Sequence, residues 1–82
     1  MHYIYILRCN DETLYTGYTI DLKQRLKAHN QKLGARYTRA RLPVELVYHE
    51  VFDNKSEALK REYQIKQLSR QEKLILIQKK DD

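Results

Sequence analysis

Two short segments rich in tyrosine, isoleucine, leucine and threonine, separated by four polar residues, place the strongest constraint on the fold. They run from Tyr3 to Cys9 and from Leu14 to Thr19, and their composition is typical of two strands joined in a β-hairpin. A connection that sets Cys9 opposite Thr13 would put the odd-numbered side chains of both strands on one face of the sheet. The side chains expected to share that face are Tyr3, Tyr5, Leu7, Cys9, Tyr15, Gly17 and Thr19.

Three helices are predicted from capping patterns, in which a short polar residue precedes a glutamate or glutamine by three positions. The pairs are Asp21 with Gln24, Asn54 with Glu57, and Ser69 with Glu72. The first helix is expected from Leu22 to Leu33, because no helix breaker occurs before Gly34, a natural residue to follow a helix end. The other two are expected over residues 56–67 and 69–79.

A third strand is expected over residues 44–51, directly after Pro43, where valine, leucine and tyrosine recur. The order ββαβαα predicts an α/β fold of the α+β kind, with a small three-stranded antiparallel sheet flanked by helices. A chain of 82 residues has room for one modest core. We therefore expect a single domain over residues 1–82, with residues 81–82 as a frayed tail.

Charge and cysteine content narrow the expected partners and compartment. The net charge of +5 favours polyanions, nucleic acid first and an anionic lipid surface second, although such a charge is also common as a solubilising feature. The single cysteine, Cys9, cannot form an intrachain disulfide and suits the reducing cytoplasm. The N-terminal residues lack signal-peptide features, and no apolar run approaches the roughly 20 residues of a membrane span. We expect a cytoplasmic protein with no membrane partner.

Two basic side chains lie where the first predicted helix should face the core. Leu22, Leu26 and Leu33 define its apolar stripe, His29 falls inside this stripe, and Arg25 lies beside it one turn earlier. A buried unpaired charge costs several kcal/mol, so such side chains must find partners or line a cleft. A hydrogen-bonded core histidine and a structural ion pair are the plain alternatives to a functional cleft.

An acidic side chain interrupts the apolar face of the second predicted helix. Glu62 projects within the arc of Ala58, Leu59 and Ile65, and a carboxylate there requires a cation. That cation could be a metal ion, Arg25 or Lys66, and Lys66 at i+4 is the simplest structural partner. These alternatives stay open from the residues alone.

A basic stretch links the first helix to Pro43. Its positive side chains could track phosphates while the aromatic ring among them stacks on a base. A solvated loop or a dimer contact would explain the same composition. The residues are Lys32, Arg36, Tyr37, Arg39 and Arg41.

The ordered set of motifs resembles the GIY-YIG nuclease superfamily, and within it the short stand-alone members. Tyr3-Ile4-Tyr5 stands where the family has GIY, with tyrosine in place of glycine, and Tyr15-Thr16-Gly17 stands for YIG, with threonine in place of isoleucine. The helix arginine, the histidine that follows it and the metal-binding glutamate of the family match Arg25, His29 and Glu62. The resemblance extends from Tyr3 to about Leu74 and implies the fold derived above.

The resemblance implies cleavage of phosphodiesters in DNA or another nucleic acid, with DNA favoured over RNA, and with one divalent metal and no small-molecule cofactor. Glu62 would hold Mg²⁺ or Mn²⁺, because carboxylate oxygen suits these hard ions. Tyr5 would deprotonate the attacking water, with its pKa lowered by the metal and by basic neighbours, and Tyr15 could take this role or bind the phosphate. Arg25 would grip phosphate oxygens with its planar fork, and His29 would orient Tyr5 or share its proton.

The sequence departs from the family pattern in one place that bears on turnover. Many members carry an asparagine on the helix after the glutamate, and here Lys73, Leu74 and Ile75 stand in that region. Lys66 or Gln67 could substitute for it. The rival prediction is therefore a nucleic-acid-binding module that kept the fold and lost turnover, and a third is a docking domain with no nucleic-acid partner.

Overall fold

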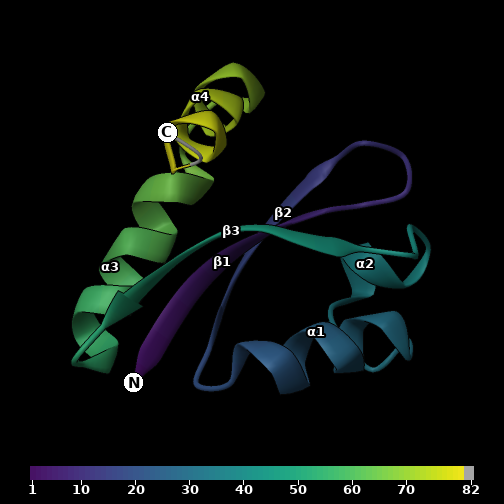
Figure 1. Ribbon diagram of the computed structural model, residues 1–82, viewed down its shortest axis with the longest axis horizontal. Coiled ribbons are helices and arrows are strands. Elements are labelled where there is room, and N and C mark those ends of the chain that lie inside the picture. Colours follow the sequence, from purple (N-terminus) through teal and green to yellow (C-terminus); the bar gives the residue numbers. More distant parts are fainter. Residues whose placement is uncertain (81–82) are drawn as a thin grey trace.

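The computed structural model describes residues 1–80, apart from the side chain of Lys80, and contains an antiparallel sheet of strand order β2-β1-β3 (Figure 1). β1 (His2–Arg8) is the central strand, β2 (Leu14–Thr19) is one edge and β3 (Glu45–Phe52) is the other. The predicted three-stranded antiparallel sheet is confirmed. The predicted frayed tail, residues 81–82, lies outside the described residues.

Helices cover both faces of this sheet, as Figure 1 shows. The helices of the described chain are α1 (Leu22–Asn30), α2 (Arg36–Arg39), α3 (Lys55–Lys66) and α4 (Arg70–Lys80). The predicted order ββαβαα is confirmed except for α2, a single short helix inside the stretch that was expected to be an irregular basic connection. No helix in residues 1–80 is both long and apolar enough to span a membrane.

Alternate residues of β1 supply two separate cores. Ile4 and Ile6 face α3 and α4, where they pack with Tyr48, Ala58 and Ile65. The odd-numbered side chains face α1 and α2 and form the second core, whose buried members are Tyr5, Leu7, Cys9 and Val44. Because β1 is covered on both faces, its residues 4–7 are all buried and read as a continuous run of large side chains.

The hairpin register agrees with the prediction. Tyr5 lies opposite Gly17, Leu7 lies opposite Tyr15, and the backbone N–H of Cys9 donates to the Thr13 carbonyl at 2.9 Å. The odd-numbered side chains of both strands therefore share the face covered by α1. This register places Tyr5 and Tyr15 on the same side of the sheet.

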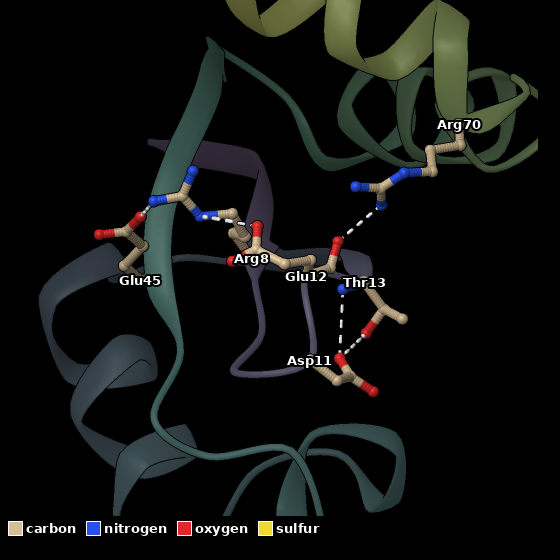
Figure 2. Close-up of polar contacts among 6 residues, drawn as sticks. All are labelled: Arg8, Asp11, Glu12, Thr13, Glu45 and Arg70. Carbon is tan, nitrogen blue, oxygen red and sulfur yellow. Dashed lines mark hydrogen bonds and ion pairs between the residues drawn. The ribbon is translucent and has the colours of Figure 1, made fainter.

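Polar contacts fix the turn that sets this register, as Figure 2 shows. Within the turn, Asp11 Oδ1 accepts hydrogen bonds from the Thr13 N–H at 3.1 Å and from its hydroxyl at 2.5 Å. From α4, Arg70 Nη1 donates to the Glu12 carbonyl at 2.6 Å. Arg8, at the end of β1, forms ion pairs both with Glu12 in the turn, at 3.9 Å, and with the first residue of β3. The turn is thus attached to both β3 and the C-terminal helix.

All three predicted N-terminal caps are present, and the third is reciprocal. Asp21 accepts from the Gln24 N–H at 3.0 Å and Asn54 from the Glu57 N–H at 2.8 Å. At α4, the Ser69 N–H donates to the partner carboxylate at 2.9 Å, and the Ser69 hydroxyl accepts the partner N–H at 3.1 Å.

The predicted end of the first helix is wrong, because α1 stops at residue 30 instead of 33. Lys32, with φ of 65°, takes the left-handed position that was expected of Gly34. The Lys32 N–H bonds the His29 carbonyl at 3.1 Å and the Leu33 N–H bonds the Ala28 carbonyl at 2.8 Å, which is the Schellman pattern. Leu33 therefore leaves the apolar stripe and is exposed.

Truncation of Ile65 should test the core between α3 and the sheet. Ile65 is fully buried, so Ile65→Ala should lower the free energy of unfolding by about 2–5 kcal/mol through lost burial and a residual cavity. Leu59→Ala on the same helix is the control, because Leu59 is 40% exposed and should change stability much less. Urea denaturation measures both, and equal losses would contradict this packing.

Candidate active site

The hydroxyl of Tyr5 lies in a polar network on the sheet face covered by α1. Its oxygen is 3.0 Å from His29 Nε2 and accepts a hydrogen bond from Arg25 Nε at 3.3 Å. On the other side of the imidazole, His29 Nδ1 is 2.8 Å from Thr38 Oγ1, and the Thr38 hydroxyl donates to the Ala35 carbonyl at 2.9 Å. The structure therefore brings Tyr5, Arg25 and His29 together as a hydrogen-bonded cluster.

Burial controls the acidity of this cluster. Tyr5 is 2% exposed and His29 is fully buried. Burial raises the pKa of Tyr5 above its ordinary value; Arg25 opposes the rise, and the charge of Glu62 adds to it. Burial, followed by the charge of Arg25, lowers the pKa of His29. The predicted lowering by basic neighbours is present, since Arg25 lowers the pKa of Tyr5, but desolvation of the phenolate outweighs it. The lowering expected from a bound metal stays a prediction.

Both glycines of the sequence give space to the rings of this cluster. A Cβ at Gly17 would lie 2.4 Å from the Tyr5 hydroxyl oxygen, and a Cβ at Gly34 would lie 2.2 Å from His29 Nδ1. Neither glycine has a positive φ, so each is needed for close approach and not for backbone conformation. Gly34 was expected to end the helix, and its role is close approach instead.

Tyr15 extends the cluster toward α2. Its ring centroid is 5.5 Å from that of His29 and 6.4 Å from that of Tyr5. Tyr37 stacks on Tyr15 with a centroid separation of 5.9 Å, and the Arg41 guanidinium lies 4.0 Å from the Tyr37 ring centroid. Tyr15 is partly exposed and is therefore more accessible than Tyr5. The Tyr37 ring is already held by its contacts with Tyr15 and Arg41.

The other motif residues shape the sheet. Ile4 is in the core beneath α3, and Thr16 is buried opposite Ile6 with no hydrogen-bond partner for its Oγ1 among the described residues. The Tyr3 ring makes an edge contact with His49 at 6.3 Å. None of these three side chains reaches the Tyr5 hydroxyl through a hydrogen bond within residues 1–80.

The predicted basic stretch divides into exposed and engaged side chains. Lys32, Arg36 and Arg39 are exposed, whereas Arg41 bonds the Asp11 carboxylate at 3.0 Å in addition to its contact with Tyr37. Beside Tyr37 a shallow notch is lined by two cationic side chains of α4 and two residues of the hairpin. The lining residues are Thr13, Leu14, Tyr37, Arg70 and Lys73. Lys73, from the region where the family asparagine was expected, therefore lies beside the same notch as Tyr37.

Glu62 comes from α3, which covers the opposite face of the sheet and also packs against β2. Its side chain is 19% exposed and pairs with Lys66 Nζ at 3.6 Å, as the simplest prediction had it. No hydrogen bond or ion pair joins Glu62 to Tyr5 or Arg25 within the described chain, but its charge reaches Tyr5 strongly enough to raise that pKa.

A single, partly accessible carboxylate fits the coordination that Mg²⁺ usually adopts. This ion keeps several waters and takes one or two carboxylates together with substrate phosphate oxygens. Among residues 1–80 no group of three or more His, Cys, Asp and Glu side chains is arranged to hold a metal. Glu62 is a carboxylate that could hold such an ion together with water and substrate oxygens.

Thr38 is the member of the cluster that the sequence did not reveal. It is fully buried, although it lies between exposed arginines in a stretch with no apolar periodicity. The only signal was that Thr38 is the one aliphatic hydroxyl between Gly34 and Pro43. Its contact with His29 depends on α2, which was not predicted.

The fold and this tyrosine-centred cluster define a known class. Residues 1–75 match the family model described as the GIY-YIG catalytic domain, and the chain belongs to this family. The family is a nuclease superfamily that acts on nucleic acids and generally uses a divalent metal. The suspected resemblance is confirmed at the level of the family.

Similar proteins that this chain covers over most of their length give a finer placement. A UPF0213 protein of Staphylococcus saprophyticus is 62% identical over 93% of both chains, and one of Clostridium perfringens is 60% identical over 98% of this chain and 86% of its own. The solution NMR structure of the UPF0213 protein of Bacillus halodurans has a TM-score of 0.62 and 48% identity over 94% of this chain and 82% of its own. The chain is thus similar throughout to short stand-alone GIY-YIG proteins.

Buried neutral His29 should make stability depend on pH. The folded pKa lies below the unfolded value of about 6.5, so the unfolded state binds the proton more readily. The free energy of unfolding should therefore be highest above the unfolded pKa and fall as the pH drops toward the folded pKa. Denaturation of wild type and His29→Gln from pH 5 to 8 measures this, and parallel pH profiles would contradict it.

Proposed function

We propose that this chain is a metal-dependent endonuclease that hydrolyses phosphodiesters in nucleic acid, with DNA favoured over RNA. The observation that carries the proposal is the Tyr5 hydroxyl held between Arg25 Nε at 3.3 Å and His29 Nε2 at 3.0 Å. Membership of a nuclease superfamily supports the class of reaction. Arg25, His29, Tyr5, Tyr15 and Glu62 are assigned roles in this proposal.

Tyr5 is the general base, and His29 receives its proton. Burial keeps the phenol protonated at neutral pH, so Tyr5 can accept a proton from water only when its own proton leaves. The Tyr5 O–H bond breaks as a bond from hydrogen to His29 Nε2 forms, which leaves a phenolate and an imidazolium. The phenolate removes a proton from the attacking water, and the freed electron pair forms the new bond to phosphorus.

The remaining steps restore the starting state. The bond from phosphorus to the leaving oxygen breaks, and this oxygen takes a proton from solvent. The Nε2–H bond of His29 breaks as its hydrogen returns to the Tyr5 oxygen, and Tyr5 passes the hydrogen that it took from water to solvent. Burial and the charge of Arg25 both disfavour the charged ring and so favour this return. The net reaction consumes one water for each phosphodiester.

Arg25 has two roles in this scheme. Its charge and its hydrogen bond both lower the pKa of Tyr5, so it stabilises the phenolate as it forms. It also lines a shallow hollow between the end of β2 and α1, together with Thr19, Asp21 and Gln24. A guanidinium can bond one group through Nε and a phosphate oxygen through its terminal nitrogens.

Glu62 would hold the metal, which when bound supplies a Lewis acid for the phosphate and for the charge on the leaving oxygen. Lys66 must then leave the Glu62 carboxylate, a small rearrangement because Lys66 is half-exposed and surface ion pairs are weak. Tyr15 contacts the substrate and is the alternative base. The exposed Lys32, Arg36 and Arg39, with Arg70 and Lys73 beside the notch, bind the phosphate backbone.

Two observations favour the alternative of a binding module with weak or no turnover. Lys66 already neutralises Glu62, and Tyr5 is almost completely shielded from solvent. Nucleic-acid binding through the same basic side chains requires neither group. The two functions differ in whether bound nucleic acid is cut.

Cleavage assays should separate these functions. Wild-type protein with Mg²⁺ or Mn²⁺ should cut at least one of plasmid, single-stranded, branched or RNA substrates, and chelation should stop it. Glu62→Gln should abolish cleavage and retain binding, and Tyr5→Phe should lower kcat by about 10²–10⁴-fold, more than Tyr15→Phe. The control is Glu57→Gln, an exposed glutamate on the same helix. Retardation of every substrate without cleavage would select the binding module.

Salt titration should test the nucleic-acid surface. The affinity for duplex DNA should fall steeply with salt, and Arg36→Glu with Arg39→Glu should weaken binding and reduce the slope of log K against log salt by about 2. The control is the same charge change on exposed side chains of α3 and α4, Lys60→Glu with Lys79→Glu. Equal losses in both double variants would indicate net charge alone, and a flat titration would exclude nucleic acid as the partner.

A further inference from the structure

The direction of each hydrogen bond around His29 can be derived from the donors present. The Arg25 guanidinium has no acceptor, so Arg25 Nε donates to the Tyr5 oxygen. The single hydrogen of the Tyr5 hydroxyl then points to His29 Nε2, the other polar atom within bonding distance. A ring nitrogen that accepts carries no hydrogen, so the hydrogen of neutral His29 is on Nδ1.

The contacts on the far side of the ring agree with this assignment. His29 Nδ1 is 2.8 Å from Thr38 Oγ1, and the hydrogen of the Thr38 hydroxyl is directed to the Ala35 carbonyl at 2.9 Å. Thr38 can therefore accept the hydrogen on Nδ1. Arg25, Tyr5, His29, Thr38 and Ala35 form a chain in which each group donates to the next.

The opposite tautomer would leave a buried hydrogen without a partner. If Nε2 carried the hydrogen, the Tyr5 oxygen would accept from both Arg25 and His29. The hydroxyl hydrogen of Tyr5 would then have no acceptor among the described contacts of a side chain that is 2% exposed. An unsatisfied buried donor costs about 1–3 kcal/mol, enough to favour the Nδ1-protonated ring at equilibrium.

We infer that Thr38 is a positioning residue that fixes His29 as the Nδ1–H tautomer and so keeps Nε2 open to the proton of Tyr5. This inference rests on the proposed function, in which His29 receives that proton. When the Tyr5 O–H bond breaks and the new Nε2–H bond forms, the electron pair stays on the phenolate oxygen. The Nδ1–H bond to Thr38 persists in the imidazolium, so no group has to move.

The loop after α1 is built to deliver this hydroxyl. The Schellman turn at Lys32 ends α1 directly after His29, and Gly34 passes so close to the imidazole that a Cβ there would meet Nδ1 at 2.2 Å. Thr38 then lies on α2, a helix with no side-chain N-cap, whose one buried residue is Thr38. The close backbone approach and the buried threonine both serve the same ring nitrogen.

The tautomer can be measured without substrate. Long-range ¹H–¹⁵N correlation spectra of labelled protein distinguish a protonated from an unprotonated ring nitrogen. Wild type and Thr38→Ser, which keeps the hydroxyl, should both show a hydrogen on His29 Nδ1. Thr38→Val, which has the same shape and no acceptor, should shift His29 toward the Nε2-protonated ring. Thr38→Ala serves if the valine variant does not fold.

Either of two spectra would overturn the inference: wild type with its hydrogen on Nε2, or a folded valine or alanine variant with an unchanged tautomer. In cleavage assays Thr38→Val should lower kcat by about 10–100-fold with little change in KM, as expected for a group that orients another, and Thr38→Ser should restore most of the rate. Equal rates in Thr38→Val and wild type would also contradict it. If wild-type protein cuts no substrate, the proposed function is wrong. The NMR measurement of the His29 tautomer still tests the role of Thr38 in that case.

Discussion

The hydrogen bond between the Tyr5 hydroxyl and His29 Nε2 joins the central strand to the last turn of α1, and the local structure around it follows from bringing these two rings together. Tyr5 can lean across β2 only because Gly17 has no side chain, and the chain can close around His29 only because Gly34 has none. The turn between β1 and β2 must keep its register for Tyr5 to meet Gly17. The contacts of Arg70 and Arg8 with Glu12 in this turn therefore support the site from a distance.

Most of the fold could be predicted because its signals are local. The hairpin register follows from the length of a polar turn, and the starts of α1, α3 and α4 follow from side chains that bond the next free backbone N–H groups. The end of α1 could not be predicted this way. Gly34 resembles a helix terminator, but glycine is required there because the ring of His29 leaves no room for a Cβ. Lys32 adopts the left-handed conformation that ends the helix. This requirement is tertiary and leaves no local pattern.

The site was predictable where helical spacing carried the information. The i, i+4 relation of Arg25 and His29 placed both beside one face of the sheet, and both reach the Tyr5 hydroxyl. Thr38 could not be found, because α2 is too short to show an apolar period. The net effect on the acidity of Tyr5 could not be predicted, because burial cannot be weighed against a neighbouring charge until the structure gives the exposure of both.

Charges around Tyr5 and His29 act together on the direction of proton transfer. Arg25 lowers the pKa of Tyr5, which favours release of the phenol proton, and lowers that of His29, which opposes the transfer to the ring but favours the later loss of that proton from it. Glu62 opposes the first effect, since its negative charge raises the pKa of Tyr5. Any cation held at Glu62 weakens that opposition. The acidity of Tyr5 on one face of the sheet is therefore coupled to the charge of the Glu62 carboxylate on α3, with no hydrogen bond or ion pair between the two side chains among the described residues.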